Sequence, residues 1–318
     1  MSTKTQAQLQ PPDPLSQDLL QAFDGLFGHH PGFRPVHAKG ILLSGKFTPS
    51  AGALSLTSAP HITRASTPVA VRFSDFAGIP TVPDFDEEGA SPRGCAVRFY
   101  LADHVHTDIV AHSIDAFPVR TAEELLEFLR AIAASGPGTA HPTRIETFLS
   151  TRPAALAFVQ APKPIPTSFA HEHFFSVSAY KFTNAEGASQ FGRYRILPEE
   201  GTAYLDSATA KTQSPDFLFE ELRNRIASKP VRLRIKLQLA AEGDAVDDST
   251  IQWPSDRLIV ELGAVELNAV IPENDAEQRR IIFDTIPRVQ GIESSGDPLL
   301  EPRANLYLAS GRRRRASQ

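Results

Sequence analysis

A period-two alternation of apolar and polar residues constrains the fold of this chain more than any other feature of its sequence. From residue 231 the order is valine, arginine, leucine, arginine, isoleucine, lysine, leucine, so a strand here has one apolar and one cationic face. Similar short runs occur at 40–50, 52–57, 68–76, 94–102, 173–184, 192–201 and 256–270. Because helices do not alternate regularly with these runs, a parallel doubly wound sheet is disfavoured. The pattern predicts an α+β fold built on a curved or closed antiparallel sheet.

Four segments have helical signals instead. Ser16 is the expected N-cap of the first, and Gly28 is its stop. Thr121 and Glu124 have the spacing of a capping box at the start of the second. The expected helices span 16–28, 121–135, 215–228 and 298–310. No repeat or linker divides the chain, so we expect a flexible arm at 1–15 followed by a single domain at 16–318.

The composition excludes several classes of partner. The formal net charge of the 318 residues is −5, which disfavours binding to nucleic acid or anionic lipid. No apolar run approaches eighteen residues, and the first seventeen residues lack the regions of a secretory signal. The single cysteine, Cys95, excludes an internal disulfide and a thiolate metal cluster. We therefore expect a cytoplasmic protein with no nucleic-acid partner and no membrane partner.

Candidate chemical groups lie beside three apolar runs. In PGFRPVHAKG, residues 31–40, Arg34 and His37 stand where a polar segment enters an apolar stretch. Arg72 and Ser74 share one parity of the next run, so both face one way. Such a face normally meets water, but in a pocket the guanidinium offers a fork for a carboxylate and the hydroxyl can orient an imidazole. His112 follows a third run, where a satisfied core or surface histidine is the default interpretation.

The last expected helix carries a second set of candidates. Arg303 and Tyr307 are four residues apart, so on a helix the guanidinium can reach the phenol oxygen. From these two residues alone, a surface pair is the simpler interpretation. Arg314 belongs to a terminal basic tract that is ordinarily solvated, although a continuing helix would bring it to the same ligand.

Other motifs are weaker. His104 and His106 near Asp108 resemble a metal pair, but their place in an expected hairpin loop favours no metal. The chain has no GxSxG, no P-loop lysine motif and no convincing dinucleotide fingerprint. Hydrolase and nucleotide-binding functions are therefore disfavoured.

Eight segments, taken in order, resemble the haem catalases, specifically the small catalase-related peroxidases. They are RPVHAKG, VAVRFSDFAG, SPRGCAVRFY, DIVAHSIDAF, IQWP, LGAVELNAV, GIESSGDPLL and RANLY, and the resemblance runs from about residue 20 to the end. It implies a catalase-like antiparallel β-barrel with flanking helices and a haem b cofactor with ferric iron. It also implies a peroxidase that uses hydrogen peroxide or organic hydroperoxides to oxidise small organic donors.

The resemblance implies a role for each candidate residue. It makes His37 the distal acid/base with Ser74 hydrogen-bonded behind it, because an imidazole, which ordinarily titrates near neutrality, can accept and return a peroxide proton. It makes Tyr307 the proximal ferric ligand, supported by Arg303. It assigns the haem propionates to Arg34, Arg72 and Arg314.

Two departures from the catalase pattern, and one residue that agrees with it, shape the expected activity and assembly. His112 stands where family catalases have an asparagine that helps place peroxide, so we expect weak dismutation of hydrogen peroxide. The chain lacks the long arms and extra C-terminal domain of larger members, so we expect a monomer or homodimer. Val36 precedes His37 where allene oxide synthases, which rearrange fatty acid hydroperoxides, have threonine. That synthase activity and a non-enzymatic haem-binding barrel, with His37 idle, are the alternatives.

Overall fold

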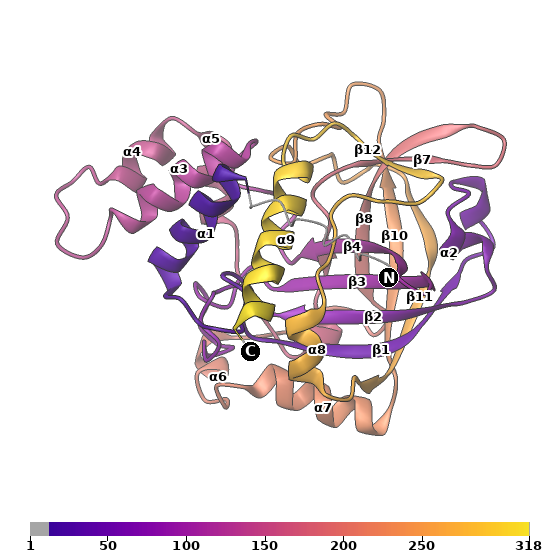
Figure 1. Cartoon of the computed structure of the whole chain (residues 1–318), viewed down its shortest axis with the longest axis horizontal. Helices are drawn as coiled ribbons and strands as arrows, with labels where there is room; N and C mark the ends of the chain where they lie inside the picture. The colour runs from indigo at the N-terminus through magenta and orange to yellow at the C-terminus, as the bar shows by residue number, and fades with distance from the viewer. Residues whose placement is uncertain (1–12, 318) are drawn as a thin grey trace, which may run out of the picture.

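A closed antiparallel barrel of eight strands forms the centre of the computed structural model, which describes residues 13–317 (Figure 1). Around the barrel the strands follow the order β10 (Val231–Leu239), β11 (Ile259–Val270), β1 (Gly40–Pro49), β2 (Thr67–Ser74), β3 (Gly94–Ala102), β4 (Val105–His112), β6 (Phe174–Phe175) and β8 (Ser189–Pro198). Pairing of β8 with β10 closes the ring. The expected α+β class with an antiparallel barrel and flanking helices is confirmed.

Short strands extend this sheet and add a second one. β7 (Tyr180–Thr183) pairs with β8, and β12 (Ile292–Ser294) pairs with β7. β5 (Ile165–Pro166) and β9 (Tyr204–Leu205) form a separate two-stranded sheet.

Side chains fill the barrel, so a ligand site must lie outside it. On β2, Val71 and Phe73 are completely buried in the apolar core, where Phe73 stacks on Phe169. An interior of eight strands is only wide enough for such side chains. Arg72 and Ser74 have the opposite parity and point outward, yet they are also buried. Their burial shows that other elements cover this part of the outer face.

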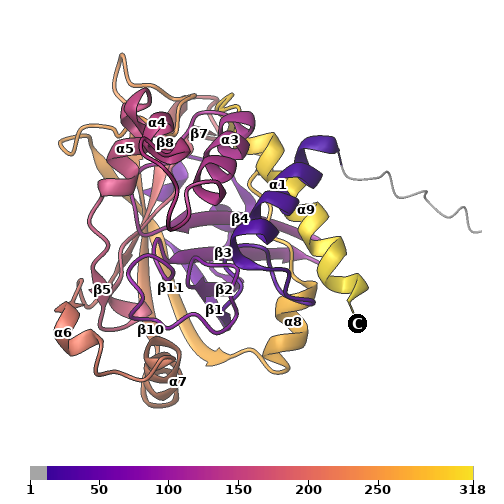
Figure 2. The same ribbon diagram turned by 90° about the vertical axis from the view of Figure 1, so that its left-hand side faces the viewer.

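Helices provide that cover on one side of the barrel. The α-helices of the described residues, not all of which lie on that side, are α1 (Pro14–Phe27), α2 (Pro60–Thr63), α3 (Ala122–Ala133), α4 (Arg144–Ser150), α5 (Pro153–Gln160), α6 (Ser207–Ala210), α7 (Phe217–Ser228), α8 (Asn274–Arg280) and α9 (Leu300–Ala316). Figure 2 shows α1 and α9 side by side, with α3 next to them. Leu19, Leu129 and Leu306 join these three helices in an apolar cluster of their own. Within residues 13–317, no helix combines the length and apolar character needed to cross a membrane.

Local signals explain where two of these helices begin. Thr121 Oγ1 accepts the Glu124 N–H at 3.2 Å and the Glu124 carboxylate accepts the Thr121 N–H at 3.4 Å, which confirms the capping box. The expected cap at Ser16 is wrong, because Asp13 caps α1 by accepting the Ser16 N–H at 2.9 Å. Pro14 starts that helix. Proline lacks an N–H, but an N–H in the first turn would have no hydrogen-bond partner within the helix, so no bond is lost. Of the arm expected at 1–15, residues 1–12 lie outside the described residues.

Two further expectations need correction. The run 52–57 is a turn with a 3₁₀ helix at Ala53–Ser55, because its N–H groups bond locally, as that of Leu56 does to Ala53 O at 3.0 Å. The last helix continues past 310 to Ala316. Arg313 in this extension holds α9 against α1 through a bidentate ion pair with Asp24, at 2.6 and 3.0 Å.

Candidate functional site

One cavity lies between the outer face of the barrel and the helical layer. β2, β3 and β4 form one wall, and α1, α3 and α9 form the other. Its atom-free space is about 1340 Å³, part of it open to solvent. The eight residues proposed from the sequence for the haem site line it, namely Arg34, His37, Arg72, Ser74, His112, Arg303, Tyr307 and Arg314. The structure thus brings together groups from both ends of the chain.

The hydrogen bonds of His37 determine which ring nitrogen is protonated. His37 Nδ1 lies 3.1 Å from the carbonyl oxygen of Asp75 and 3.1 Å from Ser74 Oγ. Because a carbonyl can only accept, Nδ1 carries the proton and Nε2 keeps its lone pair. Among the described residues nothing bonds to that Nε2. The ring therefore offers the cavity a proton acceptor.

The backbone conformation of His37 places its ring over Gly94, where the lack of a side chain leaves room for it. Its φ is +58°, in the left-handed region, and its N–H donates to Phe76 O at 2.5 Å. A Cβ atom on Gly94 would lie 2.9 Å from His37 Nδ1 and 2.6 Å from Ser74 Oγ. Only glycine fits there. Sequence reasoning missed Gly94, although a glycine at the start of an apolar strand indicates a close approach.

Both cavity histidines are neutral at pH 7. Burial, followed by the charge of Arg72, lowers the pKa of His37 from 6.5 to about 3. Burial, followed by the charge of Arg303, lowers the pKa of His112 to about 3. The expectation that His37 titrates near neutrality is thus wrong in this structure, because the ring is buried and cations lie beside it.

Tyr307 faces the same cavity from α9. One turn earlier on this helix, Arg303 Nη2 donates to Tyr307 Oη at 3.2 Å. Burial alone would lower the pKa of Arg303, but the charge of Tyr307 and this hydrogen bond raise it. The guanidinium therefore remains charged where it can stabilise a phenolate. A surface pair is the wrong interpretation, because both side chains line the cavity.

Three guanidinium groups gather at one end of the cavity. Burial lowers the pKa of Arg72 to about 9 and that of Arg314 to about 10, and it lowers the pKa of Arg34 as well. Within residues 13–317, no carboxylate forms an ion pair with any of the three. The Nε of Arg314 is buried without a partner in the same range. Buried cations without counter-charges indicate a site for an anionic ligand, and carboxylates such as haem propionates fit it.

Neutral groups hold the guanidiniums in place. Arg34 donates to the carbonyls of Gln278 and Ile281, both at 3.1 Å. Arg314 donates to Ile281 O at 2.9 Å, and Arg72 donates to Gln278 Oε1 at 3.0 Å. The segment 278–281 is therefore a common anchor, and no signal in the sequence pointed to it.

The rest of the cavity is apolar. Aromatic rings line it from α1, α3, α5 and the connecting loops, namely Phe23, Phe76, Phe117, Phe128 and Phe158. Cys95 also lines it, but burial raises the pKa of its thiol, so the thiolate needed for nucleophilic chemistry is absent. Apolar walls of this kind suit a flat apolar macrocycle. They also exclude water from the polar groups at the edges of the cavity.

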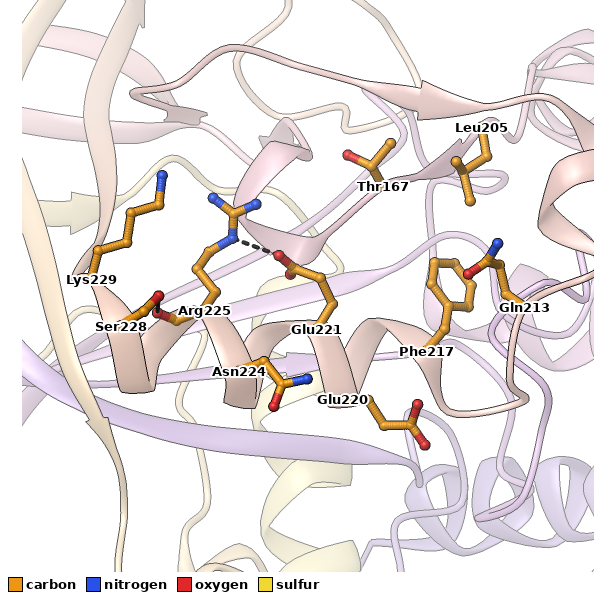
Figure 3. Close-up of a pocket in the computed structure, with 10 residues that line it drawn as sticks. All are labelled: Thr167, Leu205, Gln213, Phe217, Glu220, Glu221, Asn224, Arg225, Ser228 and Lys229. Atoms are coloured by element: carbon orange, nitrogen blue, oxygen red, sulfur yellow. Dashed lines mark hydrogen bonds and ion pairs between the residues drawn. The ribbon is translucent and has the colours of Figure 1, made fainter.

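Two other locations were candidates for chemistry. No group of three or more histidine, cysteine or acidic side chains is placed to hold a metal ion in the described part of the chain. This holds for His104, which lies in the β3–β4 turn, and for His106, which lies on β4 and not in the expected loop. Figure 3 shows an open hollow beside α7, where Glu221 and Arg225 lie beneath Thr167 and Leu205. Arg225 donates to Glu221 at 2.7 Å, and none of the eight candidate residues lines this hollow.

Comparison with known proteins gives consistent matches over nearly the whole chain. A family model described as "Catalase" matches residues 29–318. A "Catalase-related peroxidase" of Mycolicibacterium paratuberculosis is 34% identical over 295 residues, which cover 92% of each chain. A "Catalase-related peroxidase" of Synechococcus elongatus is 31% identical, over 92% of this chain and 86% of its own.

Larger proteins match over part of their length. "Catalase A" of Emericella nidulans is 30% identical over 86% of this chain but only 39% of its own. The solved structure of a fungal catalase superposes with a TM-score of 0.78 and 22% identity, over 99% of this chain and 66% of that one. This last likeness supports the fold.

Proposed function

Because the chain belongs to the catalase family, we propose that it is a haem-dependent peroxidase that uses hydrogen peroxide or organic hydroperoxides to oxidise small organic donors. Its two relatives named catalase-related peroxidase have nearly the same length, whereas it spans about two fifths of "Catalase A". One observation carries the proposal. A neutral imidazole and an arginine-bonded phenol share one apolar cavity with Arg34, Arg72 and Arg314, none of which forms an ion pair with a carboxylate of residues 13–317.

The residues that would hold the cofactor are those around this cavity. Tyr307, with Arg303 donating to its oxygen, would ligate the iron. The propionates of haem b would bind Arg34, Arg72 and Arg314. When bound, the ferric haem supplies the electrons that peroxide cleavage requires. Its carboxylates would also offset the arginine charges that depress the pKa of His37.

His37 moves the proton in this proposal. Heterolysis of a peroxide bond requires that a proton leave the inner oxygen and reach the outer one. The Nε2 lone pair of His37 accepts the first proton, while the Nδ1–H bond to Asp75 O and the contact with Ser74 fix the ring. The resulting imidazolium then donates the Nε2 proton to the outer oxygen, which leaves as water or an alcohol.

The same residues suggest a substrate range. His112 occupies the place where the resemblance expects a peroxide-placing asparagine, so we expect weak dismutation and better oxidation of donors. The ring of His112 is bulkier than an amide and leaves less room for a second peroxide. The many phenylalanines favour apolar hydroperoxides and donors. We further propose that the protein is cytoplasmic, acts as a monomer or homodimer, and has no nucleic-acid or membrane partner.

Spectra and turnover of purified protein test the proposal. The wild-type protein should bind one haem with the spectrum of ferric tyrosinate and oxidise a phenolic donor with peroxide. His37→Ala should keep the haem and lose turnover by at least about 100-fold, since one acid/base group contributes ~10²–10⁴. Full turnover in that variant would contradict the role of His37. Consumption of a lipid hydroperoxide without any donor would indicate a rearranging synthase instead.

A further inference from the structure

Two segments without any acidic residue meet near the C-terminal end of α9. Residues 25–74 contain no aspartate or glutamate, and neither do residues 302–318. Figures 1 and 2 both show the end of α9 beside α8, and the segment that follows α1 passes next to them. The formal net charge of the whole chain is −5, so this part of the surface differs in sign from the average.

Exposed arginines form the outer side of this region. Arg279 and Arg280 end α8, Arg315 lies in the last turn of α9, and all three side chains are exposed. Arg315 donates to Arg280 O at 3.0 Å, which joins the two helix ends. Within residues 13–317, none of the three forms an ion pair, although Asp275 and Glu277 also lie on α8. We call these three arginines the arginine rim.

The arginine rim lies directly outside the buried guanidiniums of the cavity. The carbonyls of Gln278 and Ile281 accept hydrogen bonds from Arg34, both at 3.1 Å. Ile281 O also accepts one from Arg314 at 2.9 Å. Residues 279–280 thus stand between two residues that contact the cavity arginines, while their own side chains face solvent. Because those buried arginines are proposed to bind the haem propionates, the rim lies over the propionate edge of the haem.

An exposed aromatic ring borders the rim. A Cβ on Gly32 would lie 3.5 Å from Arg279 Nε, so this guanidinium packs against the segment that leads to Arg34. The next residue, Phe33, is 41% exposed, although phenylalanine is usually buried. Guanidinium groups bind carboxylates and stack on aromatic rings, so this surface suits an aromatic anion.

The charge of the rest of the molecule favours a small anion over a large one. Nucleic acid or an anionic membrane would also meet the other parts of a surface whose overall charge is negative. A ligand smaller than the screening length, about 8–10 Å at physiological salt, responds mainly to the arginines beside it. The donors of the proposed reaction are of this size.

We propose that the arginine rim binds small anionic electron donors, of which phenolic carboxylates are the simplest, at the propionate edge of the haem. This deepens the proposed function and rests on it. Each donor gives up one electron and its phenolic proton and becomes a phenoxyl radical. Two donors supply the two electrons and two protons that convert a hydroperoxide into an alcohol and water. A donor bound at the rim leaves the space beside His37 to the peroxide.

Two donors that differ in charge test the inference on haem-loaded protein. At pH 7 para-hydroxyphenylacetate is an anion, and its methyl ester is neutral but has the same phenol. For the wild type, the KM of the acid should be lower than that of the ester and should rise with added salt. In the double variant Arg279→Gln, Arg280→Gln the KM of the acid should rise about 5-fold, as expected for two lost exposed ion pairs. The KM of the ester, its kcat and the haem spectrum should not change.

A control variant removes the same number of positive charges elsewhere. Arg144 on α4 and Lys211 at the end of α6 are both exposed, and Figure 2 shows both helices away from the end of α9. The double variant Arg144→Gln, Lys211→Gln should keep the wild-type KM for the acid. An equal rise in this control would mean that overall charge, and not the rim, attracts the donor, and would overturn the inference.

A second measurement does not depend on turnover. Equilibrium dialysis of para-hydroxyphenylacetate against the haem-loaded protein, without peroxide, should give an affinity about 5-fold lower for Arg279→Gln, Arg280→Gln than for the wild type. Equal affinity, or an equal KM for the acid in the two proteins, overturns the inference. Failure of the proposed function is distinguishable, because the wild type would then lack haem or would not oxidise the neutral ester.

Discussion

Adding one methyl group at Gly94 should disable the site while leaving the barrel folded. The Cβ of Gly94→Ala would lie 2.6 Å from Ser74 Oγ and 2.9 Å from His37 Nδ1, whereas ordinary contact begins at 3.4 Å. The ring must therefore retreat by about 0.5 Å. Because a displacement of 1 Å can cost about 100-fold in rate, we expect turnover to fall about 10-fold. Overpacking of this kind should also lower the free energy of unfolding by about 1–3 kcal/mol.

Donor oxidation per bound haem and urea unfolding measure the two effects. Gly52→Ala is the matched control, since no atom lies within 4 Å of its added Cβ, and both quantities should stay at wild-type values. The double variant Ser74→Ala, Gly94→Ala removes the hydroxyl contact but not the ring contact, so it should recover some stability and little turnover. Gly94→Ala with wild-type turnover and unfolding would refute the assignment of this glycine.

Three more predictions concern other parts of the molecule. Tyr307→Phe removes the phenol oxygen that Arg303 contacts at 3.2 Å, so haem should be lost or its iron spectrum should change; an unaltered absorption spectrum would exclude Tyr307 as ligand. Thr121→Ala should cost about 1 kcal/mol in urea unfolding, because the α3 cap is lost, and an unchanged midpoint would count against the cap. Burial raises the pKa of Glu172 from 4.5 to about 7, so the folded protein keeps a proton that the unfolded chain releases. The stability that this bound proton contributes is fully present below about pH 4.5. As the pH rises from 4.5 to 7 it is lost, which lowers the free energy of unfolding by about 3 kcal/mol. Glu172→Gln should remove this decline, and an identical decline in the variant would contradict the raised pKa.

The sequence determined those features that depend on near neighbours. The period of two fixed which side chains share a strand face, so Arg72 and Ser74 were expected on one side and are found there. The i, i+4 spacing placed Arg303 next to Tyr307, and the capping box set the start of α3. These features follow from the 2.0 and 3.6 repeats of the backbone, which operate over a few residues.

Tertiary structure alone decided which of those faces became a site. The parity of Arg72 is that of a solvent-facing residue, and it is buried because Gln278 of α8 and the backbone of residues 37–38 pack against it outside the barrel. On β10 the same alternation leaves Arg232 exposed and paired with Glu266. The His37 tautomer likewise depends on the carbonyl of Asp75, a residue far along the chain that the fold brings next to the ring. Such contacts join segments that the chain brings together only on folding, so no local repeat can encode them.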